Sequence, residues 1–289
     1  MTPHPRLSIN QATIKRASLA EALRVTSAAG VGAIGLWREP VAEVGLDTAV
    51  RMVADSGLRV SSLCRGGFFT APEGTKRRAA LDENRRAIAE TAALAAPGAP
   101  GSAAVLVLVA GGLPAGSTDL AGARALVGEA IAELEPEARA AGVTLAIEPL
   151  HPMYVADRAV VSTLGQALDL AEPFPAASVG VVVDTFHCWW DPEVFAQIAR
   201  AGDAGRIASY QVCDFLTPLP ADVLLARGMM GEGHVDFTSI TDAVTATGYT
   251  GDVEVEIFNA EIWATDPFDV VERTVRAFAE HIRVPVVLA

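Results

Sequence analysis

The stretch "LAGARALVGEAIAELEPEARAAGVTLAIEPL", residues 120–150, shows the unit from which this chain is built. Its first part is rich in Ala, Leu, Glu and Arg and has the length of an amphipathic helix. Gly142 then stands where a left-handed residue commonly ends a helix, and the apolar run 142–150 predicts a strand. A helix that passes so directly into a strand is typical of parallel α/β proteins.

The same alternation runs through the 289 residues, with another helix-like segment at 77–96. Strands are predicted at 7–13, 31–37, 58–64, 103–110, 142–150, 178–184, 207–214 and 252–258. About eight strands separated by helices predict one (β/α)₈ TIM barrel as a single domain over residues 1–289, with a doubly wound open sheet as the alternative. The Pro- and Gly-rich segment 96–104 is interpreted as a helix-to-strand loop, because connections in such units are short.

Composition limits the partners. The formal net charge of −13 argues against a nucleic acid, whose binding relies on clustered Lys and Arg. The apolar stretches are shorter than the roughly 20 residues that cross a bilayer, and residues 1–11 lack the regions of a signal peptide. We therefore expect a soluble cytoplasmic protein with neither a nucleic-acid nor a membrane partner. With Lys15 and Lys76 as the two lysines, a Schiff-base aldolase is disfavoured.

Polar residues stand near the carboxyl ends of four predicted strands: Glu148, Asp184, Gln211 and Glu256. Barrel enzymes build their sites at that end. Because side chains two apart on a strand share a face, each of these residues is expected to point inward. The inward neighbours would be Ala146, Val182, Ser209 and Glu254, and the outward ones Ile147, Val183, Tyr210 and Val255.

Three carboxylates that converge in an apolar barrel repel one another unless a cation neutralises them. A divalent metal bound by Glu148, Asp184, Gln211 and Glu256 is the simplest explanation, and oxygen ligands favour Mg²⁺ or Mn²⁺ over Zn²⁺ or Co²⁺. The alternative for each acid is a partner Arg or a helix cap. Glu254 could replace Glu256, but it lies one layer deeper, and Glu256 is preferred.

Several motifs together resemble the xylose isomerase-like TIM barrels, which comprise sugar isomerases and epimerases such as tagatose 3-epimerase, inosose dehydratase and the endonuclease IV enzymes. The resemblance rests on "IEPLHP", "DTFH", "QVCDF", "RGMMGEGHVDF" and "GYTGDVEVEIF", which occur in this order between residues 147 and 258. It implies that Glu148, Asp184 and Glu256 bind the metal and that His187 and Arg227 contact substrate oxygens. The family usually has histidine in a His-x-x-Asp pattern where this chain has Gln211, three residues before Asp214.

The resemblance also implies a reaction. A ketose or keto-sugar derivative would chelate the metal, and Glu148 and Glu256 would transfer a proton as base and acid through a metal-stabilised enediolate. Epimerisation and isomerisation share this step. A lyase, either a dehydratase or a keto-glycoside eliminase, and a sugar-binding barrel without activity remain open. The endonuclease branch is disfavoured, because its strand-end histidines are absent from "LCRGGF" and "LVAGGLP".

Residues just after strands are weaker candidates. His151 and Trp37 could contact the substrate, or could stabilise a loop and cap the core. Arg38 and Arg65 could bind an anionic group of the substrate, but a surface ion pair is the favoured interpretation for each. A homo-oligomer is possible, although no interface is legible in the sequence.

Overall fold

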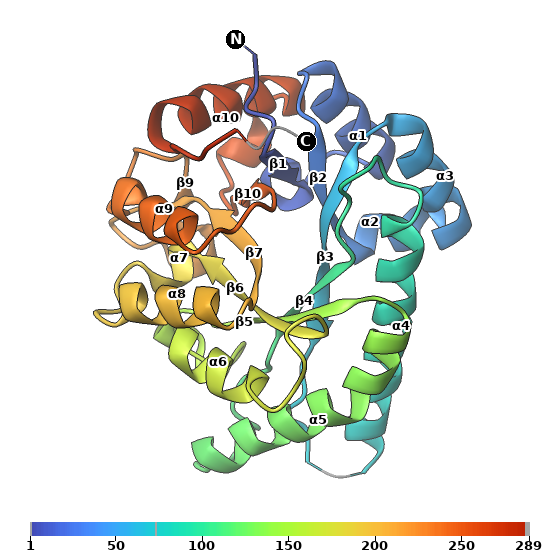
Figure 1. Cartoon of the computed structure of the whole chain (residues 1–289), viewed down its shortest axis with the longest axis vertical. Coiled ribbons are helices and arrows are strands. Elements are labelled where there is room, and N and C mark those ends of the chain that lie inside the picture. Colours follow the sequence, from blue (N-terminus) through green and yellow to red (C-terminus); the bar gives the residue numbers. More distant parts are fainter. Residues whose placement is uncertain (1, 73, 287–289) are drawn as a thin grey trace.

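The computed structural model describes residues 2–72 and 74–286, and its centre is a closed barrel of eight strands (Figure 1). Every neighbouring pair is parallel, and the strands follow one another around the barrel in the order β1-β10-β7-β6-β5-β4-β3-β2. Their bounds are β1 (Leu7–Asn10), β2 (Ala33–Trp37), β3 (Arg59–Gly67), β4 (Val105–Val109), β5 (Thr144–Glu148), β6 (Val179–Asp184), β7 (Ile207–Val212) and β10 (Val253–Val255). The predicted barrel is confirmed, and the open sheet is wrong because β1 pairs with both β2 and β10.

Helices surround the barrel and occupy the segments between its strands (Figure 1). They are α1 (Leu19–Ala28), α2 (Arg38–Val44), α3 (Leu46–Ser56), α4 (Thr75–Ala95), α5 (Leu120–Ala140), α6 (Leu164–Ala171), α7 (Thr185–Cys188), α8 (Val194–Asp203), α9 (Phe237–Ala246) and α10 (Pro267–His281). Four short 3₁₀ turns complete the set: η1 (Gln11–Ile14), η2 (Pro152–Tyr154), η3 (Val223–Ala226) and η4 (Ile262–Ala264).

Local sequence explains where these elements end. Gly142 follows α5 with φ of +69°, a conformation that glycine adopts without steric cost. The segment 96–104 joins α4 to β4, as predicted. Most strands are shorter than predicted, for instance β1, since residues 11–14 form η1, and β10, which ends at Val255, whereas β3 runs on to Gly67.

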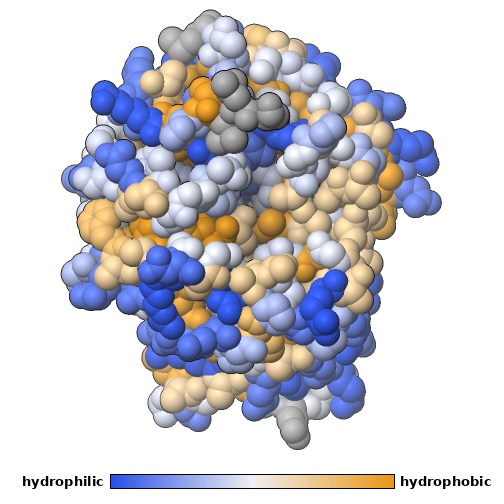
Figure 2. Space-filling view, viewed as in Figure 1, coloured by the Kyte–Doolittle hydropathy of each residue, from blue (hydrophilic) through white to orange (hydrophobic). Residues whose placement is uncertain are grey.

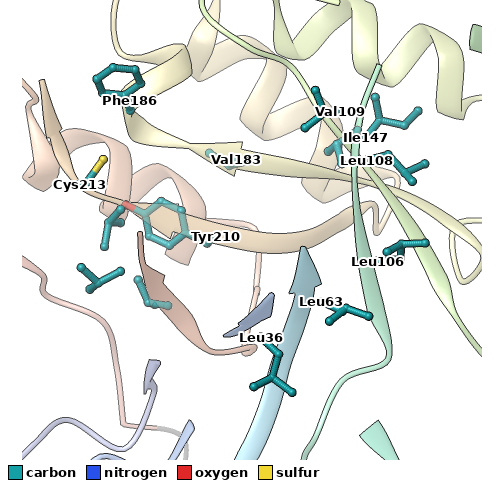
Figure 3. Close-up of a cluster of buried hydrophobic side chains, with 14 of the residues drawn as sticks. Leu36, Leu63, Leu106, Leu108, Val109, Ile147, Val183, Phe186, Tyr210 and Cys213 are labelled. Atoms are coloured by element: carbon teal, nitrogen blue, oxygen red, sulfur yellow. The ribbon is translucent and has the colours of Figure 1, made fainter. Parts of the chain in front are cut away.

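Two apolar clusters pack on opposite faces of the strands. The larger lies between barrel and helices, and Figure 3 shows side chains of it that come from β2 to β7. It contains Ile147, Val183 and Tyr210, whereas the small cluster inside the barrel contains Ala146 and Val182. For these residues the predicted alternation of inward and outward side chains is confirmed. The inward face is also the face of the polar residues near the carboxyl ends of the strands.

A small antiparallel sheet, β8 (Asp214–Phe215) with β9 (Arg227–Gly228), follows β7 and was not predicted. The Asp214 carboxylate accepts hydrogen bonds from the backbone N–H groups of Gly231, Gly233 and Val235, at 2.7–3.0 Å. The aspartate of the "QVCDF" motif therefore fixes the glycine-rich turn that comes after Arg227.

Hydrophilic residues gather around the periphery of the face shown in Figure 2, and more apolar ones lie across its middle. Within residues 2–72 and 74–286, every helix is too short or too polar to cross a membrane.

Candidate active site

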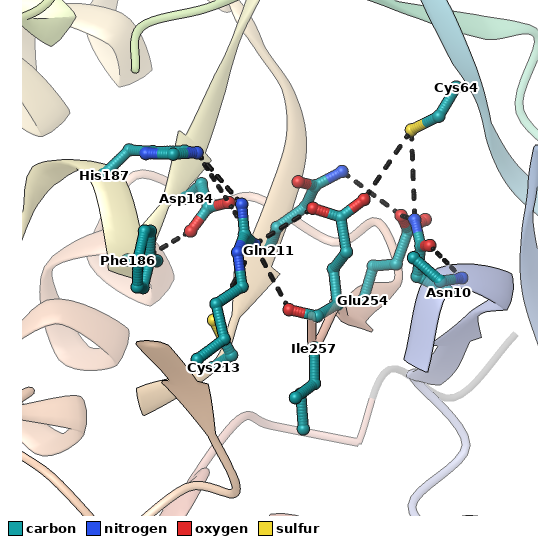
Figure 4. Close-up of polar contacts among 12 residues, drawn as sticks. Asn10, Cys64, Asp184, Phe186, His187, Gln211, Cys213, Glu254 and Ile257 are labelled. Atoms are coloured by element: carbon teal, nitrogen blue, oxygen red, sulfur yellow. Dashed lines mark hydrogen bonds and ion pairs between the residues drawn. The ribbon is translucent and has the colours of Figure 1, made fainter. Parts of the chain in front are cut away.

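The four predicted ligands are all buried, and Figure 4 shows Asp184 and Gln211 among the polar contacts inside the barrel. Glu148 and Asp184 are the last residues of β5 and β6, Gln211 lies in β7, and Glu256 directly follows β10. A cavity of about 360 Å³ opens here, a size typical of sites for small molecules. Of the predicted site residues, it is lined by Trp37, Glu148, His187, Arg227 and Glu256.

Arg227 lies among these carboxylates and is itself buried. Its guanidinium donates to Asp184 Oδ2 and to Glu256 Oε2, each at 3.0 Å. The alternative that individual acids pair with an arginine therefore holds for two of the three. With Glu148 included, three carboxylates face one guanidinium, so fully ionised side chains leave two negative charges, which a divalent cation would balance.

Glu148 is the carboxylate without a partner. It is 5% exposed, and its Oε1 is buried with no hydrogen bond from the described residues. Burial, followed by repulsion from Glu256 and Asp184, holds the pKa of Glu148 well above its ordinary value. A buried carboxyl in this state either keeps a proton or binds a cation.

Burial also raises the pKa of Glu256 to about 7, although Arg227 opposes the shift. The pKa of Asp184 is raised by burial too, against the favourable charge of Arg227. Glu256 can thus take up or release a proton near neutral pH, the range in which general acids and bases act best, and the pKa of its neighbour Glu148 is shifted in the same direction.

One layer deeper, the carboxylate of Glu254 is fully hydrogen-bonded. It accepts from Asn10 Nδ2 at 2.6 Å and from the hydroxyls of Ser61 and Ser62 at 2.5–3.0 Å. Gly35 on β2 makes room for it, because a Cβ there would lie 2.5 Å from the Glu254 carboxyl carbon. These contacts and the depth of Glu254 favour Glu256 as the residue that faces the cavity.

Gln211 connects the two layers. Its Nε2 donates to Glu254 Oε1 at 3.2 Å, which fixes the orientation of the amide. Its Oε1 is buried and has no hydrogen-bond partner among the described residues. Figure 4 shows this oxygen turned away from Glu254, toward the side where Asp184 lies.

His187 is buried beside the acids, and its tautomer follows from its neighbours. Its Nδ1 accepts the backbone N–H of His151 at 3.1 Å, so the proton of the neutral ring is on Nε2. Burial and the charge of Arg227 lower the pKa of His187 well below its ordinary value and keep the ring neutral. Nε2 lies 3.0 Å from Nη2 of Arg227, so the ring and the guanidinium lie side by side at the cavity.

The remaining candidates have different surroundings. Trp37 donates its indole N–H to Asn10 Oδ1 at 2.7 Å and presents its ring to the cavity. The His151 ring accepts the N–H of Met153 and stacks on Phe215, contacts that favour the loop-stabilising alternative.

The two arginines that follow strands differ. Arg38 forms the expected ion pairs with Glu83 and Glu90. Arg65 does not: it lines the cavity, and no carboxylate oxygen of the described residues lies within 4.0 Å of its guanidinium. The prediction of a surface ion pair was wrong for Arg65, because its side chain turns inward over aromatic rings.

The donor atoms fit a divalent cation. One ligand atom each from Glu148, Asp184 and His187 lies within 4.8 Å of the other two. The unpartnered Oε1 atoms of Glu148 and Gln211 add free acceptors. The Nε2 proton of His187 argues against that ring as a ligand, since metal binding needs an imidazole nitrogen without a proton.

Sequence reasoning missed several polar residues at this end of the barrel, among them Asn10 and Arg158. Asn10 ends β1 and links Glu254 to Trp37, but it lay in the middle of the predicted strand 7–13, so no strand end marked it. Arg158 lines the cavity from the segment after η2, where no strand pattern marks it.

A family model described as "xylose isomerase-like TIM barrel" matches residues 23–281. The chain belongs to this family. L-ribulose 3-epimerase of Mesorhizobium japonicum is 31% identical over 133 residues, which span 46% of this chain and 40% of that enzyme. The chain thus matches less than half the length of that curated relative.

Two solved structures resemble the fold over nearly its whole length. A protein of Sinorhizobium meliloti 1021 is 48% identical, with a TM-score of 0.89, covering 96% of this chain and 98% of that one. The IOLI protein, solved with a bound zinc atom, is 19% identical, with a TM-score of 0.81 and the same coverage. At that identity the second likeness shows the fold alone.

Proposed function

We propose that this chain is a divalent-metal-dependent isomerase or epimerase that moves a proton on a keto sugar. The observation that carries the proposal is the pair Glu148 and Glu256, two buried carboxyls with raised pKa that line one cavity. They come from β5 and β10, which β6 and β7 separate in the barrel, so they reach the substrate from different sides. Membership of the xylose isomerase-like family and the partial similarity to an L-ribulose 3-epimerase support it.

In this proposal Glu148 and Glu256 remove and return the proton of the carbon beside the carbonyl. Glu256, whose pKa is about 7, can begin as the base or as the acid, and Glu148 takes the complementary role. His187 Nε2–H and the Arg227 guanidinium donate to the substrate oxygen that gains charge, a role that suits preorganised donors in a buried site.

The metal ligands in the proposal are Glu148, Asp184, Gln211 and Glu256. When bound, the ion would supply Lewis-acid stabilisation of negative charge on substrate oxygens. Oxygen ligands favour Mg²⁺ or Mn²⁺, and the zinc of the IOLI structure makes Zn²⁺ the comparison to run.

The test has two readouts. First, metal analysis of protein purified without chelator, with melting curves in Mg²⁺, Mn²⁺ and Zn²⁺, should give one tightly bound ion per chain and a higher Tm. Second, keto sugars incubated in D₂O with the metal-loaded protein should exchange the proton on the carbon beside the carbonyl.

The outcomes separate the candidates. Absence of both bound metal and thermal stabilisation contradicts the metal site. Loss of water or of an aglycone from the sugar identifies a lyase instead. Tight binding of sugars without any exchange indicates a sugar-binding barrel.

A further inference from the structure

One wall of the cavity carries two cations on aromatic rings. The cavity is lined here by Lys15, which follows η1, by Trp37 at the end of β2, by Arg65 within β3 and by Phe258 after β10. The Lys15 ammonium lies 4.8 Å from the ring centre of Trp263, and the Arg65 guanidinium lies 5.6 Å from that of Trp37. In the barrel order β1 and β2 are across from β5 and β6, which carry Glu148 and Asp184, whereas Glu256 follows β10 on the wall itself.

Neither cation has a carboxylate partner within 4.0 Å among residues 2–72 and 74–286, although the chain has 35 acidic residues against 22 Lys and Arg. Arg158, which also lines the cavity, differs because Asp157 and Asp222 lie 3.7 and 4.0 Å from it. Glu39 and Glu43 reach the rim from α2, but both are exposed and neither pairs with Lys15 or Arg65.

The aromatic rings hold this wall together. Trp37 packs edge-on against Phe258, and Phe258 against Trp263, with ring centres 5.5 and 5.8 Å apart. The hydrogen bond from the Trp37 indole to Asn10 fixes one end of the row. Rings of this kind pack on the C–H face of a sugar, and cations at the two ends of the row are free to bind charge.

We propose that the cavity takes a keto sugar with an anionic group, a carboxylate or a phosphate, at the end remote from Glu148. Arg65 binds that group and Lys15 adds positive charge on the same wall. The planar guanidinium suits two parallel hydrogen bonds to a carboxylate or phosphate. The assignment of the reacting end to Glu148 and Glu256 rests on the proposed function, whereas the anion site itself rests on the unpaired cations.

The anion site is tested with three ligands that share one carbon skeleton, D-fructose, D-fructuronate and D-fructose 6-phosphate, with Mg²⁺ present. Apparent Kd is measured from thermal stabilisation against ligand concentration, a readout that needs no turnover. At least one anionic ligand should bind about tenfold more tightly than D-fructose, as expected for a charge-assisted contact. The uronate and the phosphate ester distinguish the two anion classes.

Arg65→Gln should remove the preference for the anionic ligand, and Arg65→Lys should keep part of it. Arg38→Gln is the matched control, because Arg38 is ion-paired with Glu83 and Glu90 away from the cavity, and it should keep the whole preference. A wild-type protein that binds neither anion more tightly than D-fructose overturns the proposal, as does an Arg65→Gln variant that retains the preference.

Ligand titration and proton exchange, both measured on the wild type, separate this proposal from the proposed function. An anion preference without proton exchange in the wild type means that the reaction was wrong and the anion site right. Proton exchange on neutral sugars without a preference for anionic ligands means that the reaction was right and the anion site wrong.

Discussion

Glu254 and Glu148 lie in two layers of the same barrel, and their surroundings are opposite. Glu254 accepts hydrogen bonds from Asn10, Ser61 and Ser62, and Gln211 adds a fourth donor. Glu148, one layer nearer the cavity, accepts none from the described residues. A buried charge with a full set of donors stabilises the fold in which it lies, whereas a buried carboxyl without donors is explained only by a proton, a cation or a substrate.

The largest effect is expected from Glu148→Gln. The amide keeps the shape of the side chain but cannot remove a proton, so the exchange rate should fall about 10²- to 10⁴-fold. Because Glu148 forms no hydrogen bond that the change would break, Tm without metal should stay within a few degrees of wild type. A variant that exchanges at the wild-type rate would show that Glu148 is neither base nor acid.

The same substitution in the deeper layer should act on stability. In Glu254→Gln one oxygen becomes an NH₂ group, which cannot accept: in place of Oε1 it meets the Asn10 amide donor, and in place of Oε2 it meets the Ser61 hydroxyl, which must turn to accept. Hydrogen bonds to charged groups contribute about 1.5–3 kcal/mol, and the free energy of unfolding should fall by about that amount. Urea denaturation of both variants without metal measures the difference, and equal stabilities would remove the distinction between the layers.

The barrel and the strand ends could be predicted because their signals are local. Alternating apolar runs mark the strands, and the last polar residue of a strand marks the mouth of a barrel. Arg65 and Arg38 show the limit of such local signals. Both follow a strand pattern, yet Arg38 meets two glutamates of α4 while Arg65 turns over Trp37 into the cavity. Which carboxylates surround a side chain depends on the packing of distant elements, and no local pattern in the sequence records that.

The position of Arg227 was beyond the sequence for the same reason. The resemblance implied a substrate contact, but the pairing with Asp184 and Glu256 arises from the β8–β9 sheet, whose turn Asp214 fixes. The layer nearer the cavity, with Glu148, Asp184 and Glu256, is called the upper layer here. The single positive charge of Arg227 does not balance these three carboxylates, and this is the reason to expect a metal in the upper layer and not around Glu254.

The smallest predicted effect follows from protons that compete with the metal in the upper layer. Metal binding needs ionised carboxylates, and the pKa of Glu256 without metal is about 7. Below that pH the group is protonated, so Mn²⁺ must displace a proton, and its apparent Kd should rise about tenfold for each unit by which the pH falls. The raised pKa of Glu148 acts in the same direction. Above pH 7 the contribution of Glu256 levels off.

Titration of Mn²⁺ by calorimetry between pH 6 and 8 measures the slope of apparent Kd against pH. Glu256→Gln should flatten this slope, while Glu254→Gln leaves it unchanged. An Mn²⁺ affinity equal at both ends of that range would mean that the carboxyls of the upper layer are already ionised, and the two layers would then not differ in the way that their hydrogen bonds imply.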